Sequence, residues 1–147
     1  MQIANLLNSS ELTFPILECF HIAGFIIAIG TTAIVDFRIL GYGLLGQTPS
    51  QLMKSTRFWT LGGLLVAIFT GLGLYSSDPD TYYLNLSFLF KIACLILAII
   101  LNYTIHGKVA KADSTSGGAK VVACISLALW GAVIFGGIFI AFVQGGL

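Results

Sequence analysis

Long stretches without charge constrain this chain more than any other feature of its sequence. Residues 12–35 hold a single charged side chain, and residues 58–77 hold none. Lys91 is the one charge within residues 81–107, and residues 121–147 have none. Each stretch reaches the ~20 apolar residues that cross a hydrocarbon core as a helix. The sequence therefore predicts an all-α integral membrane protein.

Four helices follow from these stretches, at about 13–35, 58–76, 84–106 and 121–143. We expect them to form one four-helix bundle over the whole chain, 1–147. Charged residues make up 9% of the chain, against roughly 25% in soluble domains. The net charge of +1 argues against a nucleic-acid-binding protein, which needs a basic surface. The first span lacks the basic start of a signal peptide, so we expect it to stay in the protein.

The basic residues predict the orientation of the helices. Six of the seven lie in the first and third connections, which the positive-inside rule places in the cytoplasm, with both termini outside. These six are Arg38, Lys54, Arg57, Lys108, Lys111 and Lys120.

The first connection contains a helix-start signal. Thr48 is a suitable N-cap, Pro49 suits the first helical position and Gln51 completes a capping box. We expect a short interfacial helix over 49–57 that runs into the second span.

Small and amide side chains predict contacts between the helices. Gly24, Ala28 and Thr32 recur every four residues and form a stripe for close packing. Asn85 and Asn102 lie at the two ends of the third span and are expected to hydrogen-bond neighbouring helices. Cys19, Cys94 and Cys124 share no metal-ligand spacing, so we expect buried, small apolar residues there.

Three ionisable residues lie inside predicted spans, where they are costly and usually face the bundle interior. Glu18 and His21 are three apart and share a helix face. Lys91 lies at a similar depth in the outer half of the third helix, which runs parallel to the first. The sequence predicts that these three side chains meet.

Two interpretations of this group remain open. In one, Glu18 and Lys91 form a buried ion pair that sets helix register, and His21 hydrogen-bonds nearby. In the other, His21 is a metal ligand, the axial ligand of a haem b. Lys91 then lies near a propionate or serves as a second ligand, with Glu18 supporting His21.

His106 closes the third helix and is a further candidate cofactor-binding residue. It lies ~20 Å from His21 in depth at 1.5 Å per residue, so one haem held by both histidines of a monomer does not fit. We expect His106 beside Asp36 and Arg38 at the cytoplasmic edge, where it caps the helix end.

Several of these residues carry a family resemblance over nearly the whole chain. The pattern comprises Pro15, Glu18, His21, Gly24, Gly30 and the segment from Asp36 to Gly41, then Arg57, Trp59, Thr70, Gly71, Tyr83, Asn85, Phe88, Lys91 and Asn102. It resembles a bacterial family of four-helix inner-membrane proteins of unknown function, similar in layout to copper-resistance-D-type proteins and small b-type cytochrome membrane domains. The resemblance implies a bundle in the bacterial inner membrane with a haem or copper role.

The leading functional hypothesis is a small redox-associated membrane subunit that binds haem b for electron transfer. The alternative is a non-catalytic bundle that oligomerises or serves as a structural subunit of a larger complex. A proton or small-molecule carrier using Glu18 and Lys91 is a third possibility. No nucleophile elbow, P-loop or metalloprotease motif is present, so we expect no enzymatic activity from the chain alone.

Overall fold

The computed structural model describes residues 12–143 and is all-helical over that range. The long helices are α2 (Thr13–Leu40), α3 (Pro49–Ser77), α5 (Leu86–Leu101) and α7 (Gly117–Val143). A short α4 (Pro79–Tyr83) links α3 to α5, and a π-helix η1 (Asn102–His106) continues α5 into α6 (Gly107–Lys111). Four helical segments, with α5, η1 and α6 counted as one, are long and apolar enough to cross a membrane.

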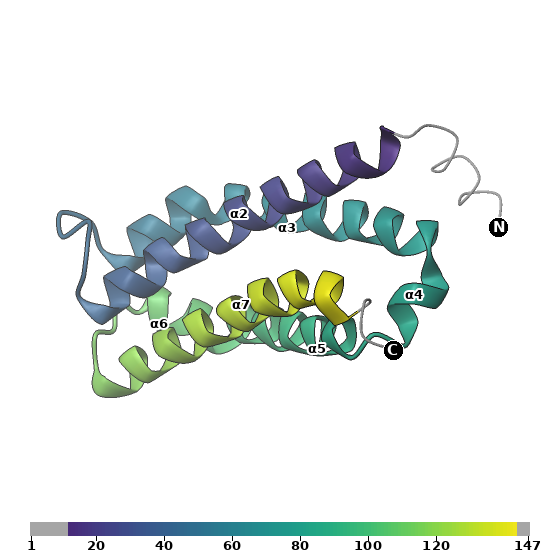
Figure 1. The fold of residues 1–147 in the computed structure, drawn as a ribbon. Coiled ribbons are helices and arrows are strands. Elements are labelled where there is room, and N and C mark those ends of the chain that lie inside the picture. Colours follow the sequence, from purple (N-terminus) through teal and green to yellow (C-terminus); the bar gives the residue numbers. More distant parts are fainter. Residues whose placement is uncertain (1–11, 144–147) are drawn as a thin grey trace.

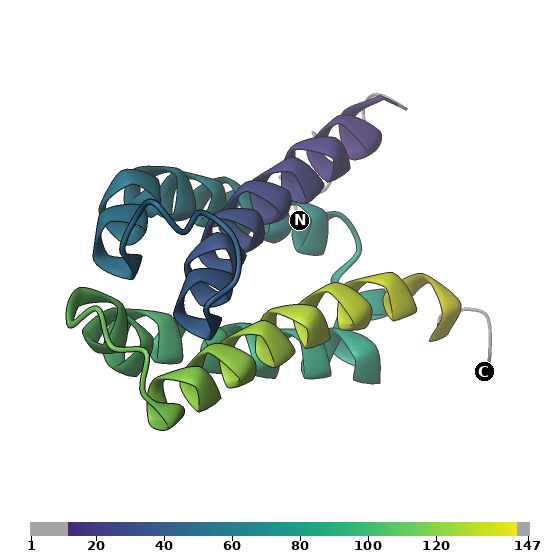
Figure 2. The same ribbon diagram turned by 90° about the vertical axis from the view of Figure 1, so that its left-hand side faces the viewer.

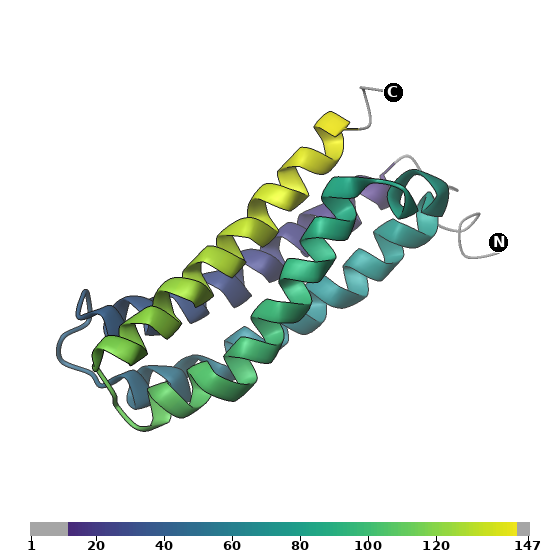
Figure 3. The same cartoon turned by 90° about the horizontal axis from the view of Figure 1, so that it is seen from below.

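Two antiparallel hairpins make up the bundle. Helices α2 and α3 form one layer, and α5 and α7 form the other (Figures 1 and 2). Figure 3 shows α5 and α7 side by side on the face seen from below. The α2–α3 and α6–α7 connections lie at one end of the molecule and α4 lies at the other. The first and third connections therefore share a side, as the basic residues predict; their position in the cytoplasm is a separate prediction.

The interfacial helix predicted over 49–57 runs into the second span, and the two form one continuous α3. The Thr48 hydroxyl accepts from the Gln51 backbone N–H at 3.3 Å, and the Gln51 side chain accepts from the Thr48 N–H at 2.9 Å. This capping box, with Pro49 at the first position, starts the helix as predicted. The predicted outer position of the two termini concerns residues 1–11 and 144–147, which lie outside the described part of the chain.

The hairpin α2–α3 is held by very close backbone approach. A Cβ atom on Gly24 would lie 2.7 Å from the Gly63 carbonyl oxygen, and a Cβ on Gly63 would lie 2.7 Å from the Gly24 carbonyl oxygen. Ala28 and Thr32 continue the stripe and are buried. Small residues allow this contact, and the packing that results is what holds helices together in lipid. The predicted close-packing stripe is confirmed, and it packs α2 against α3 of the same chain.

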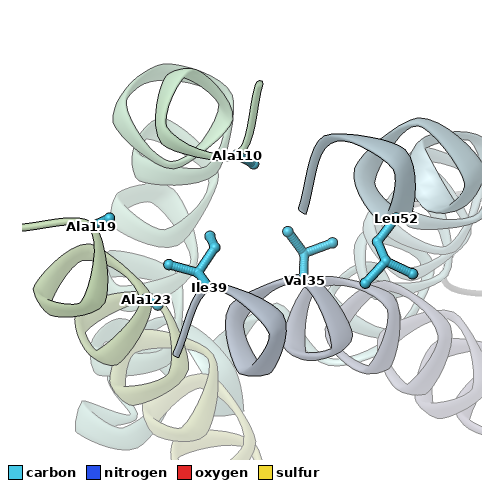
Figure 4. Packing of buried hydrophobic residues seen from close by; sticks show 6 residues of the cluster. All are labelled: Val35, Ile39, Leu52, Ala110, Ala119 and Ala123. Atoms are coloured by element: carbon cyan, nitrogen blue, oxygen red, sulfur yellow. The ribbon is translucent and has the colours of Figure 1, made fainter. Parts of the chain in front are cut away.

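The two layers meet in two apolar clusters. One lies at the end of the bundle that carries the first and third connections, and the other lies near the middle of the helices. Figure 4 shows the first cluster, which draws on α2, α3, α6 and α7 and comprises Val35, Ile39, Leu52, Ala110, Ala119 and Ala123. The second comprises Ala28, Leu64, Ala98 and Trp130. Large apolar side chains face outward instead, as expected where lipid rather than water surrounds the protein; examples are Phe20, Trp59, Phe69, Leu97 and Phe135.

Candidate functional site

His21 on α2 is held by helix α3. Its Nδ1 lies 2.7 Å from the carbonyl oxygen of Ala67 and 3.3 Å from the Thr70 hydroxyl oxygen. A carbonyl oxygen only accepts hydrogen bonds, so Nδ1 carries the proton and donates it to Ala67. The other ring nitrogen, Nε2, consequently has a free lone pair. The ring also packs edge-on against Phe25, with centroids 4.9 Å apart.

Lys91 on α5 meets this lone pair. Its Nζ lies 3.4 Å from His21 Nε2 and 5.0 Å from the centroid of the Phe25 ring. The ammonium group thus donates to the imidazole and contacts an aromatic face, both favourable for a cation. No carboxylate of the described residues forms an ion pair with Lys91. The predicted meeting of His21 and Lys91 is confirmed, and it joins the two hairpins.

Glycines on the other two helices make room for the pair. A Cβ atom on Gly71 of α3 would lie 2.8 Å from His21 Cε1. On α7, a Cβ on Gly136 would lie 3.0 Å from Lys91 Cβ, and one on Gly137 would lie 3.3 Å from Lys91 Nζ. All four long helices therefore contribute to the site, although its polar atoms come from α2, α3 and α5. Of the residues around the pair, four belong neither to the predicted site nor to the family pattern; they are Phe25, Ala67, Gly136 and Gly137.

The predicted ion pair between Glu18 and Lys91 is wrong. Glu18 is exposed, and the single ion pair formed within residues 12–143 is a different one. Glu18 lies one helical turn before His21, closer to the α4 end of the molecule. A carboxylate so near the helix end reaches the polar interface at little cost, whereas burial beside Lys91 would require its desolvation.

Aromatic residues form a layer one turn beyond the His21–Lys91 pair. Tyr75 follows Gly71 by four residues, and Phe88 precedes Lys91 by three. Their rings stack with centroids 5.6 Å apart, and Tyr82 of α4 packs against both. Partial burial, with help from the nearby carboxylates of Asp78 and Glu18, raises the pKa of Tyr82 above its ordinary value.

A second polar cluster is buried at the opposite end. His106 Nε2 lies 2.7 Å from Asp36 Oδ1, and the Ser126 hydroxyl donates to Asp36 Oδ2 at 2.7 Å. All three side chains are at most 2% exposed. The His106–Asp36 contact has ion-pair distance without hydrogen-bond alignment. His106 Nδ1 has no hydrogen-bond partner among the described residues.

The predicted position of His106 beside Asp36 is confirmed, but its predicted role as an interfacial cap is wrong. The π-helix η1 ends at His106, and α6 carries the helix on to Lys111. His106 is consequently internal to a longer helix and faces the core. Ser126 was not identified, because one serine within an apolar span gives no signal by itself.

The remaining predicted contact residues have separate roles at helix ends. Asn85 caps α5 by accepting from the N–H groups of Ser87 and Phe88, and its amide donates to the Ile140 carbonyl of α7 at 3.3 Å. Arg38 Nε donates to the Gln47 carbonyl at 2.6 Å. Arg57 is exposed, and Asn102 begins η1.

Metal-ligating side chains do not gather anywhere in residues 12–143. No group of three or more His, Cys, Asp or Glu side chains there has metal-binding geometry. Cys94 is buried as predicted, whereas Cys19 and Cys124 are exposed on the outer faces of their helices. No family model, curated protein or solved structure matches the chain.

Proposed function

We propose that this chain is a small redox-associated membrane subunit, with His21 as a ligand of haem b. The observation that carries the proposal is the 2.7 Å contact between His21 Nδ1 and the Ala67 carbonyl oxygen. Metal-binding histidines are typically oriented in this way, with one ring nitrogen donating to a carbonyl and the other facing the metal. In this chain the facing nitrogen is Nε2, the usual haem-binding atom of histidine.

The residues around Nε2 fit such a group in their chemistry. Lys91 supplies a positive charge without a carboxylate partner in the described chain, suited to a haem propionate. Lys91 Nζ lies 3.4 Å from His21 Nε2, so this side chain would have to adopt another rotamer before Nε2 could bind a metal. Haem b, when bound, supplies one-electron transfer; His21 would hold it and Lys91 would balance its charge. His106, at the opposite end, is not part of this proposal.

A second candidate function is a non-catalytic structural subunit. It is favoured by the mutual contact of His21 and Lys91, which leaves neither side chain without a partner and joins the two hairpins. The Gly24 stripe does not support an oligomer, because it is buried against α3 of the same chain. In either role we propose a bacterial inner-membrane protein with its first and third connections in the cytoplasm.

An absorption spectrum of the purified protein tests the redox proposal. We expect a Soret band in the oxidised protein, sharpened α and β bands on reduction, and haem b in a pyridine hemochrome assay. His21→Ala should remove the bands, because it deletes the ligand nitrogen. Glu18→Gln is the matched control, since it changes an exposed residue on the next turn of the same helix, and it should leave the spectrum unchanged.

A colourless protein that is folded and lacks haem would overturn the haem proposal in favour of the structural one. In that case His21→Ala should still lower the melting temperature, because it leaves Lys91 without its hydrogen-bond acceptor. Retention of the Soret band in the His21→Ala variant would likewise show that the haem ligand lies elsewhere.

A further inference from the structure

A cavity of about 500 Å³ opens between the first turns of α3 and the η1–α6 segment. It lies toward the end of the molecule that carries the first and third connections. Its lining combines apolar surface with several polar and basic side chains. The residues that line it are Thr32, Ser50, Gln51, Met53, Lys54, Arg57, Thr60, Asn102, Tyr103, Gly107 and Lys111.

The cavity has a positive charge that the protein does not neutralise. Lys54 and Arg57 on α3 and Lys111 on α6 line it, and none forms an ion pair with a residue of 12–143. No acidic side chain is among the lining residues. Three cations held around one space without a counter-charge repel one another. An anion in that space would remove the repulsion.

Asp113 is the acidic residue at the rim, and its carboxylate is already occupied. One oxygen accepts from the Ser50 backbone N–H at 2.8 Å, and the other accepts from the Ser50 hydroxyl at 2.9 Å. These bonds, chiefly the backbone one, lower the pKa of Asp113, so it remains ionised. The Ser50 N–H, which is the first backbone donor of α3, is therefore already occupied by Asp113. Recognition of an anion in the cavity consequently depends on side chains.

Two residues that line the cavity offer neutral hydrogen-bond donors. The π-helix η1 begins at Asn102, and both Asn102 and Tyr103 line the space. The Asn102 amide and the Tyr103 hydroxyl form no hydrogen bond with a described residue. Widened π turns frequently occur at functional sites. In this chain one such turn places donors at the cavity on one side and His106 in the core on the other.

We propose that this cavity binds a phosphate group, either on the headgroup of an anionic phospholipid or on a soluble phosphate compound. Phosphate carries more charge and more acceptor oxygens than a carboxylate, and so matches three cations and two neutral donors. Basic residues at a membrane surface also attract anionic lipid headgroups. The site is separate from the His21–Lys91 pair and does not depend on the proposed function.

Binding measurements on the purified full-length protein in neutral detergent test the proposal. Native mass spectrometry would follow dioctanoyl phosphatidylglycerol, with dioctanoyl phosphatidylcholine as the uncharged comparison. Calorimetry would follow inorganic phosphate against chloride at equal ionic strength. Binding of phosphatidylglycerol alone identifies a lipid headgroup as the source of the phosphate. Binding of inorganic phosphate, with or without the lipid, shows that a soluble phosphate suffices.

Paired variants separate the cavity from general surface charge. Arg57→Gln with Lys111→Gln should weaken binding of the active probe by about tenfold or more, because charge-assisted hydrogen bonds are lost. Lys108→Gln with Lys120→Gln removes the same charge from the same end outside the cavity and should weaken binding much less. If the first pair does not fold, Lys54→Gln replaces it.

The proposal is overturned if neither probe binds, or if the two double variants weaken binding equally. Equal weakening would mean that net charge, and not the cavity, attracts the anion.

Discussion

At the scale of single residues, the trio of Asp36, His106 and Ser126 buries three polar side chains inside the bundle. A carboxylate that is 0% exposed requires a nearby positive charge or hydrogen-bond donors. His106 and Ser126 supply them from two other helices. These three residues therefore connect α2, η1 and α7 through buried polar contacts, of which the Ser126–Asp36 hydrogen bond is directional.

Replacing Asp36 should accordingly be costly. Asp36→Leu leaves His106 and Ser126 without their shared partner and should lower the free energy of unfolding by about 3–5 kcal/mol. Ser126→Ala removes one donor to the carboxylate and should cost about 1–3 kcal/mol. Circular dichroism during thermal unfolding in detergent measures both.

Ser55→Ala is the control for these variants, because the Ser55 hydroxyl is exposed and bonds only to the carbonyl of its own helix. It should change stability by less than about 0.5 kcal/mol. If Ser126→Ala is equally mild, the buried trio contributes little to the fold.

At the scale of helices, the close packing of α2 on α3 should be sensitive to one added methyl group. In Gly24→Ala the new Cβ would lie 2.7 Å from the Gly63 carbonyl oxygen and 2.8 Å from the Ala67 backbone nitrogen. Backbone atoms cannot relieve the clash by changing rotamer, so the helices must separate. We expect the free energy of unfolding to fall by about 1–3 kcal/mol. The melting temperature in detergent reports the loss.

Gly30→Ala provides the matched comparison on the same helix. A Cβ atom there meets no atom within 4 Å. Because alanine favours helix over glycine, this variant should be neutral or more stable by up to about 1 kcal/mol. Similar melting temperatures for the two variants would show that α2 and α3 are not in close contact at Gly24.

At the scale of the whole molecule, the first and third connections lie together, and their sidedness is testable. In a background with Cys19, Cys94 and Cys124 changed to alanine, single cysteines would be placed at Gly46 and Asp80. A membrane-impermeant maleimide should label Asp80→Cys in intact spheroplasts but Gly46→Cys only after lysis, because basic connections stay in the cytoplasm. The opposite labelling pattern would reverse the topology.

The candidate site could be predicted in part at this scale. Parallel helices and equal depth correctly predict that His21 and Lys91 meet. The same reasoning fails for Glu18, because depth does not distinguish a side chain that faces the bundle from one that reaches the interface. It also fails to identify the cavity, whose residues come from three segments that are distant in the sequence.

The sequence by itself determines that the chain folds as four apolar helices. Uncharged runs of this length suit a bilayer, where the backbone must satisfy its own hydrogen bonds as a helix. It also determines where α3 starts, since the capping box is a local signal. The sequence places His21 near Lys91 and His106 near Asp36, but only the tertiary structure decides which of the candidate polar contacts form and leaves Glu18 exposed. His21 meets Lys91 and Asp36 meets His106 because helix rotation and the π turn orient these side chains, and rotation depends on packing against neighbours far away in the chain.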